Sequence, residues 1–157
     1  MPRPFRSGGQ GGLQGRLQRD DLTLALFNAP LGTASLIEPL IEHDVRDYFL
    51  MSLTQACDVL GKVARPHARL QLDLSHWQMT AGGLAGAIRE FWSLAGHIRI
   101  AGVPWRHEPD VGEINCRYIF DVVDHLGYKG WNGCENRPRA ATLRGLGGWA
   151  RDIGIGI

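Results

Sequence analysis

The clearest hydrophobic pattern in the chain is LQLDLSHWQ, residues 70–78, where apolar and polar residues alternate. Alternation predicts a β-strand with an aliphatic face formed by the leucines and a polar face that carries Asp73. His76 follows where a loop would begin. In a parallel α/β sheet the carboxyl ends of the strands bind ligands, so Asp73 and His76 could share a polar site. In the alternative interpretation, Asp73 caps the next helix and His76 is a surface residue.

The rest of the chain alternates between strand and helix patterns. Apolar runs or alternation predict strands, and apolar residues three and four apart predict helices. The predicted strands are 22–27, 36–40, 69–74, 97–101 and 129–135, and the predicted helices are about 45–63, 83–95, 115–126 and 139–150. Asn115 is the predicted N-cap of the third helix and Gly127 its stop. This order predicts an α/β fold with a parallel sheet.

Composition bounds the class of protein. The chain has 157 residues, 44% hydrophobic and 21% charged, which predicts one globular domain. The formal net charge of +1 gives no general attraction to nucleic acid or to a membrane surface, and no apolar run approaches the ~18 residues of a membrane span. We therefore expect no nucleic-acid or membrane partner.

The first twenty residues differ from the remainder. They are rich in Gly, Arg and Gln and show no apolar period, so we interpret 1–20 as a disordered tail and 21–157 as the folded domain. A cytoplasmic location is expected; because arginines precede the first acid, Asp20, a mitochondrial presequence is the alternative. Cys57, Cys116 and Cys134 show no CxxC spacing, which predicts neither a disulfide framework nor a zinc site. Cys57 is expected in the core.

Four predicted strands end in polar side chains: Glu38, Asp73, Arg99 and Glu135. Carboxylates brought together without water repel one another by several kcal/mol, at an effective dielectric of about 20. A divalent cation relieves that repulsion and prefers oxygen ligands. A carboxylate left partly free could then move a proton next to a carbonyl group.

Five motifs in order make a more specific signal. They are LIEPL (36–40), LQLDLSHWQ (70–78), GHIRIA (96–101), RHEPDVGEIN (106–115) and GYKGWNGCEN (127–136). From about residue 36 to 150 the chain resembles the hydroxypyruvate isomerases, members of the xylose-isomerase-like TIM barrels. ALFNAP (25–30) resembles an earlier strand of the same family.

The resemblance implies an intramolecular oxidoreductase of the aldose–ketose type, in carbohydrate metabolism, whose substrate is a small hydroxy-keto acid. It would interconvert hydroxypyruvate and tartronate semialdehyde through an enediolate. By motif position, the resemblance makes Glu38 and Glu135 the acid/base pair and also metal ligands, with Asp73 as a third ligand to Mg or Mn. His76 and Arg106 would bind the substrate.

Two departures from the family pattern affect these expectations. A (β/α)8 barrel needs about 250 residues, and the motifs present resemble strands 3, 5, 6, 7 and 8. We therefore expect a partial TIM-type barrel of about five parallel strands that does not close, with an open sheet edge through which copies could form a homo-oligomer. Arg99 stands at the fourth metal-ligand position, where the family usually places Gln, and Ile41 stands where it usually places Asn. Arg has no lone pair to offer a metal, so Arg99 either swings away or neutralises the acids as a fixed cation.

Two further functions stay open at this stage. A truncated, catalytically impaired homologue could act as a binding protein through its open edge. A related sugar isomerase or epimerase could use the same carboxylates on another substrate.

Overall fold

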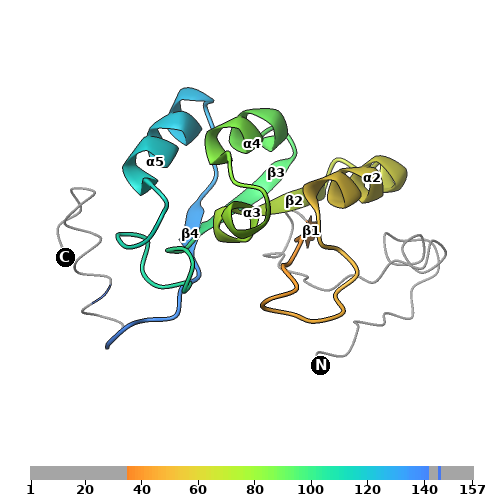
Figure 1. The fold of residues 1–157 in the computed structure, drawn as a ribbon. Coiled ribbons are helices and arrows are strands. Elements are labelled where there is room, and N and C mark those ends of the chain that lie inside the picture. Colours follow the sequence, from red (N-terminus) through yellow and green to blue (C-terminus); the bar gives the residue numbers. More distant parts are fainter. Residues whose placement is uncertain (1–34, 142–144, 146–157) are drawn as a thin grey trace. The chain divides into compact units, whose positions relative to one another are not determined.

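A computed structural model describes residues 35–141 and residue 145 (Figure 1). The predicted tail 1–20, the predicted strand 22–27 and most of the predicted helix 139–150 lie outside the described residues. The chain divides into two compact units, residues 1–72 and 73–157. No helix in the described part is long and apolar enough to cross a membrane.

The first unit contains a parallel pair of strands and one helix. β1 (Ser35–Ile37) pairs with β2 (Ala68–Asp73), with Leu36 opposite Arg69, and α2 (Leu53–Val63) connects them. Strand–helix–strand connection of parallel strands is the unit from which α/β folds are built. The predicted strand 36–40 is real but shorter, since regular pairing stops before Glu38.

The helix of the first unit begins later than the sequence pattern predicted. Apolar residues recur at helical spacing from residue 45, but α2 starts after Ser52. The Ser52 side chain accepts a hydrogen bond from the Gln55 amide while the Gln55 side chain accepts one from the Ser52 amide, a capping box that fixes the start. Asp47, with φ at 56°, is incompatible with a helix running through it. Cys57 is half-buried at the side of the helix rather than in the core, and no disulfide joins the three cysteines, which all lie in the described residues.

The second unit contains the other described strands and three helices: α3 (Leu74–Thr80), α4 (Leu84–Phe91), β3 (Ala95–Ile100), α5 (Cys116–His125) and β4 (Asn132–Cys134). β3 and β4 are parallel, with Arg99 opposite Gly133. Figure 1 shows α4 and α5 side by side, and the two helices are in contact. The apolar residues of β3 alternate with His97 and Arg99, as predicted, and Ile98 and Ile100 are buried.

The boundaries in this unit confirm some predictions and correct others. Asn115 caps α5 through its side chain and Gly127, with φ at 74°, follows its end, as predicted. Leu74 was predicted to be the last residue of a strand, but it is the first residue of α3. This helix was not predicted, because the alternating pattern of 70–74 indicated a strand. Helix α4 is shorter than the predicted 83–95, because Ala95 already belongs to β3. The parallel pairing and flanking helices confirm the α/β class.

Candidate functional site

Asp73 sits at the junction of β2 and α3 and caps the helix. Its Oδ1 accepts hydrogen bonds from the Ser75 amide at 2.9 Å, the Ser75 hydroxyl at 2.5 Å and the His76 amide at 3.1 Å. These contacts satisfy amides that no intrahelical partner can reach. The helix-capping interpretation of Asp73 is therefore correct, but it accounts for one carboxylate oxygen and leaves Oδ2 for other partners.

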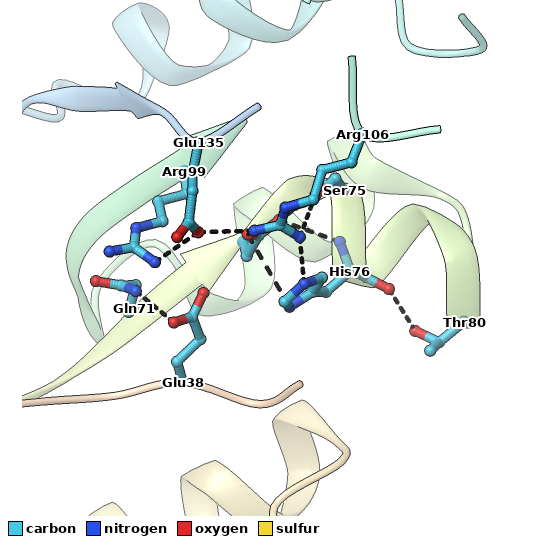
Figure 2. Close-up of polar contacts among 9 residues, drawn as sticks. Glu38, Gln71, Ser75, His76, Thr80, Arg99, Arg106 and Glu135 are labelled. Carbon is cyan, nitrogen blue, oxygen red and sulfur yellow. Dashed lines mark hydrogen bonds and ion pairs between the residues drawn. The ribbon is translucent and has the colours of Figure 1, made fainter. Parts of the chain in front are cut away.

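Arg106 donates a hydrogen bond to Asp73 Oδ2 and so connects Asp73 to Glu135. Arg106 Nη2 donates to Asp73 Oδ2 at 2.9 Å and to Glu135 Oε2 at 2.7 Å. Arg106 Nη1 contacts the Ser75 hydroxyl at 3.4 Å and also the His76 ring. Figure 2 shows the Arg106 side chain extending between Ser75 and His76 on one side and Glu135 on the other. One guanidinium thus gathers four of the polar side chains in this unit.

The contact with Arg106 fixes the tautomer of His76. Arginine donates and never accepts, so His76 Nε2, which faces Arg106 Nη1, is the acceptor. The ring proton of a neutral imidazole then lies on Nδ1, which is 3.9 Å from Asp73 Oδ2. His76 is 6% exposed, so its alternative interpretation as a surface residue is wrong.

Arg99 completes the group from the neighbouring strand. Arg99 Nη1 donates to Glu135 Oε2 at 2.7 Å, the same oxygen that Arg106 binds. The Arg99 and Arg106 side chains are 13% and 14% exposed, whereas that of Glu135 is 51% exposed. Glu135 follows β4, and its amide donates to Ile100 O at 3.3 Å, which extends the pairing of β4 with β3. Glu135 is therefore a solvent-accessible carboxylate whose Oε2 is bound by two guanidinium groups.

A glycine makes room for this arrangement. A Cβ at Gly133 would lie 2.7 Å from His97 Nε2 and 3.9 Å from Arg99 Cγ. His97 and Arg99 therefore lie over a strand position that only glycine leaves open. Burial lowers the pKa of His97, and the charge of Arg99 lowers it further. His97 therefore packs closely against Gly133, beside Arg99.

The charges around Asp73 set its protonation state. Burial raises the pKa of Asp73, but the combined opposing effects are larger. They are the electrostatic effects of His76 and of the Arg106 guanidinium, and the hydrogen bonds from the Ser75 hydroxyl and the His76 amide. The pKa of Asp73 consequently lies below its ordinary value of 3.8, and the carboxylate is ionised near neutral pH.

The loop that carries Arg106 is tied to the segment after Glu135. Arg106 has φ at 56°, an uncommon conformation for a residue with a side chain, and its carbonyl accepts from the Arg137 amide at 2.5 Å. Glu108, which is 2% exposed, accepts hydrogen bonds from the Arg139 amide at 3.2 Å and from Arg139 Nε at 3.3 Å. A Cβ at Gly145 would lie 2.2 Å from Glu108 Oε1. The buried Glu108 therefore ties Arg139 to this loop and lies against Gly145.

Glu38 lies in the first unit, directly after β1. The residue is 1% exposed, and its Oε2 accepts from Gln71 Nε2 at 2.5 Å (Figure 2). Burial together with the charge of Glu38 raises the pKa of Tyr48 to about 12, so the Tyr48 hydroxyl keeps its proton. Ile41, at the position where the family usually has Asn, is a buried core residue.

The structure thus brings Asp73, His76, Arg106, Arg99 and Glu135 together within the second unit. Sequence reasoning missed three contributors to polar contacts: Ser75, Glu108 and Gln71. The alternation of 70–78 carried a usable signal for Gln71, since it shares a strand face with Asp73. Glu108 had no such signal, because nothing in a loop sequence distinguishes a buried carboxylate from an exposed one.

The metal site that the family implies does not fit the side chains of the second unit. Asp73 and Glu135 are each bonded to Arg106, and Arg99 holds the same Glu135 oxygen. At about 4 Å and an effective dielectric near 20, two unit charges interact by about 4 kcal/mol, so a divalent ion beside Arg99 would be repelled by roughly twice that. Arg99 also offers no lone pair where a fourth ligand is expected.

Comparison with known proteins agrees with this reading of the motifs. The sequence model of the "Xylose isomerase-like TIM barrel" family matches residues 15–153. The chain is 45% identical over 119 residues to a 2-oxo-tetronate isomerase of Cupriavidus necator, which covers 76% of this chain and 46% of that protein. It is 46% identical over 119 residues to a Homo sapiens protein named as a hydroxypyruvate isomerase, covering 74% of this chain and 42% of that one.

Among solved structures, the chain is similar to a Brucella melitensis protein described as an AP endonuclease of family 2. The TM-score is 0.75 at 38% identity, and the match covers 88% of this chain and 52% of the other. The chain thus spans about half the length of the relatives that it matches.

Proposed function

This chain belongs to the xylose isomerase-like TIM barrel family, and we propose that it is an isomerase acting on a small hydroxy-keto acid. The observation that carries the proposal is the gathering of Asp73, His76 and Arg106 around an exposed carboxylate, Glu135. The two relatives named above are isomerases by name, and the five motifs resemble the hydroxypyruvate isomerases. The reaction we propose is the interconversion of hydroxypyruvate and tartronate semialdehyde.

The chemistry asked of the protein is a proton transfer between adjacent carbons. A base removes a proton from the carbon that bears the hydroxyl group, and the electron pair left behind forms the double bond of an enediolate. The former carbonyl oxygen takes up the negative charge as that double bond forms. Return of a proton to the neighbouring carbon, with transfer of the hydroxyl proton to the former carbonyl oxygen, completes the exchange of hydroxyl and carbonyl positions. A carboxylate positioned at the substrate can perform each transfer.

Glu135 has the geometry for one of these transfers. Both guanidinium groups bind Oε2, which leaves Oε1 as the oxygen available to the substrate proton. The side chain is 51% exposed, so a small substrate can reach it. By the motif LIEPL, the second acid/base residue of the proposal is Glu38.

Arg106 and His76 are the proposed substrate-binding residues. Arg106 brings a fixed positive charge to the site, which attracts the carboxylate of a hydroxy-keto acid. His76, with its proton on Nδ1, keeps Nε2 toward Arg106 and so steadies the direction of the guanidinium. Asp73 Oδ2 accepts a hydrogen bond from Arg106 Nη2 and so also holds the guanidinium.

Deuterium exchange tests the proposal without requiring net turnover. In D₂O, an active chain exchanges the carbon-bound protons of hydroxypyruvate with solvent, followed by proton NMR. Glu135→Gln removes the base and should slow exchange by about 100-fold or more. Glu113→Gln, the same substitution at an exposed glutamate of the 106–115 motif, is the matched control and should exchange at the parent rate. Absence of exchange in the parent chain, with hydroxypyruvate and with 2-oxo-tetronate alike, would contradict the proposal.

A further inference from the structure

The carboxylates of the second unit are already neutralised by the protein itself. Two acids, Asp73 and Glu135, are bonded to two guanidinium groups, those of Arg99 and Arg106, at 2.7 to 2.9 Å. The formal charge of these four side chains sums to zero. A divalent cation placed among them would leave the group with an excess of two positive charges, with no further acid in the set to compensate.

Arg99 is held in position rather than swung away from the acids. Its side chain is 13% exposed, it lies beside His97 over Gly133, and its Nη1 donates to Glu135 Oε2 at 2.7 Å. Turning Arg99 outward would break that ion pair and would leave Glu135 with one guanidinium. Of the two roles that the sequence left open for Arg99, the geometry favours the fixed cation.

We propose that Arg99 replaces the divalent ion at the Asp73–Glu135 end of the site, so that this chain binds no metal there. Arg99 and Arg106 supply the positive charge beside Glu135 that a metal would otherwise bring. The inference rests on the proposed function for the identity of the site, and it concerns how that site is charged. Asp73 and Glu135 are oxygen ligands of the kind that Mg²⁺ and Mn²⁺ take. The proposal therefore predicts that Arg99 is the residue that prevents a divalent metal from binding to them.

The test is direct titration of the full chain with Mn²⁺ in the absence of substrate, by calorimetry and by loss of the free-ion electron paramagnetic resonance signal. The parent chain should show no stoichiometric binding. Arg99→Gln removes the fixed charge and adds an amide oxygen, and should bind one ion per chain at least about tenfold more tightly than the parent. Arg99→His provides a second neutral ligand, should circular dichroism show that the Gln variant does not fold. Arg89→Gln, at an exposed arginine of α4, is the matched control and should behave like the parent.

Two results would overturn the inference. One is tight binding of one Mn²⁺ by the parent chain that Glu135→Gln abolishes. The other is a folded Arg99→Gln or Arg99→His variant that binds no better than the parent. The deuterium exchange of the parent chain, measured with and without EDTA, separates this inference from the proposed function: exchange should be unaffected by EDTA. Loss of exchange under EDTA would count against Arg99 as the cation, whereas absence of exchange under both conditions would count against the isomerase proposal alone.

Discussion

Asp73 caps helix α3 with one carboxylate oxygen and binds Arg106 with the other. Each role alone is common for a strand-end aspartate, and their combination in a residue 5% exposed makes it sensitive to charge. Asparagine is also a good N-cap, so an Asp-to-Asn change separates the two roles. What such a variant loses is the charge opposite Arg106.

Asp73→Asn should therefore destabilise the protein by about 1.5–3 kcal/mol near neutral pH, the range for hydrogen bonds to charged groups. Because the pKa of Asp73 in the folded protein lies below 3.8, its contribution is fully present above about pH 4 and is lost as the pH falls through the folded pKa. Urea unfolding at a series of pH values from 7 to 2 measures this. The parent should lose more stability below pH 4 than Asp73→Asn, and Asp121→Asn, at an exposed position of α5, should follow the parent. Parallel curves for the parent and Asp73→Asn would show that Asp73 is not coupled to folding.

At the scale of elements, the loop from Gly102 to Glu113 decides where Arg106 lies. Its turns bring backbones very close: a Cβ at Gly112, where φ is 105°, would lie 2.1 Å from Val103 O. The far side of the loop is tied down by Glu108, whose carboxylate meets Arg139. These contacts hold the loop in place, and Glu108 is the buried acid that anchors it.

Glu108→Gln tests that support. The amide keeps the shape of the side chain but not its charge, so the ion pair with Arg139 is lost, and we expect a cost of about 1–3 kcal/mol in the free energy of unfolding. If Glu108 positions Arg106, the substrate KM should rise more than kcat falls, because Arg106 is a proposed binding residue. The readouts are urea unfolding and steady-state kinetics, with Glu113→Gln as the exposed control. An unchanged KM in a destabilised variant would limit Glu108 to a structural role.

Much of the structure at the scale of helices and strands could be predicted from the sequence, and the predictions that failed did so for identifiable reasons. The faces of β3 and the cap of α5 followed from alternation and from Asn115. Helix α3 was missed because the leucine alternation of 70–74 runs one residue past the point where the Asp73 cap begins the helix. Helix α2 was predicted too long because apolar side chains before Ser52 happen to recur at helical spacing. The motifs located Glu135 and Arg106, but the ion pairs that Arg99 and Arg106 form with Glu135 depend on side-chain conformations that no sequence pattern records.

At the scale of the whole molecule, the chain spans about half the length of its relatives, and β4 lies at the end of its strand order. Glu135 N bonds Ile100 O, so, by the alternation of a parallel ladder, the amides of Asn132 and Cys134 point away from β3. Within the described residues no strand pairs with that side of β4. Unpaired strand amides are a template for another chain, and we propose that two copies associate along this edge.

Sedimentation equilibrium at several concentrations tests the association. The mass should rise with concentration above the 17.3 kDa of one chain. Asn132→Pro removes an outward amide while leaving the β3 ladder intact, because proline is tolerated as the first residue of an edge strand, and it should weaken association. Asn132→Ala removes the same side chain but keeps the amide, so it should associate like the parent. A mass that stays at one chain across all concentrations, or equal association in the Pro and Ala variants, would place the contact elsewhere or rule it out, because only the backbone donor distinguishes the two substitutions.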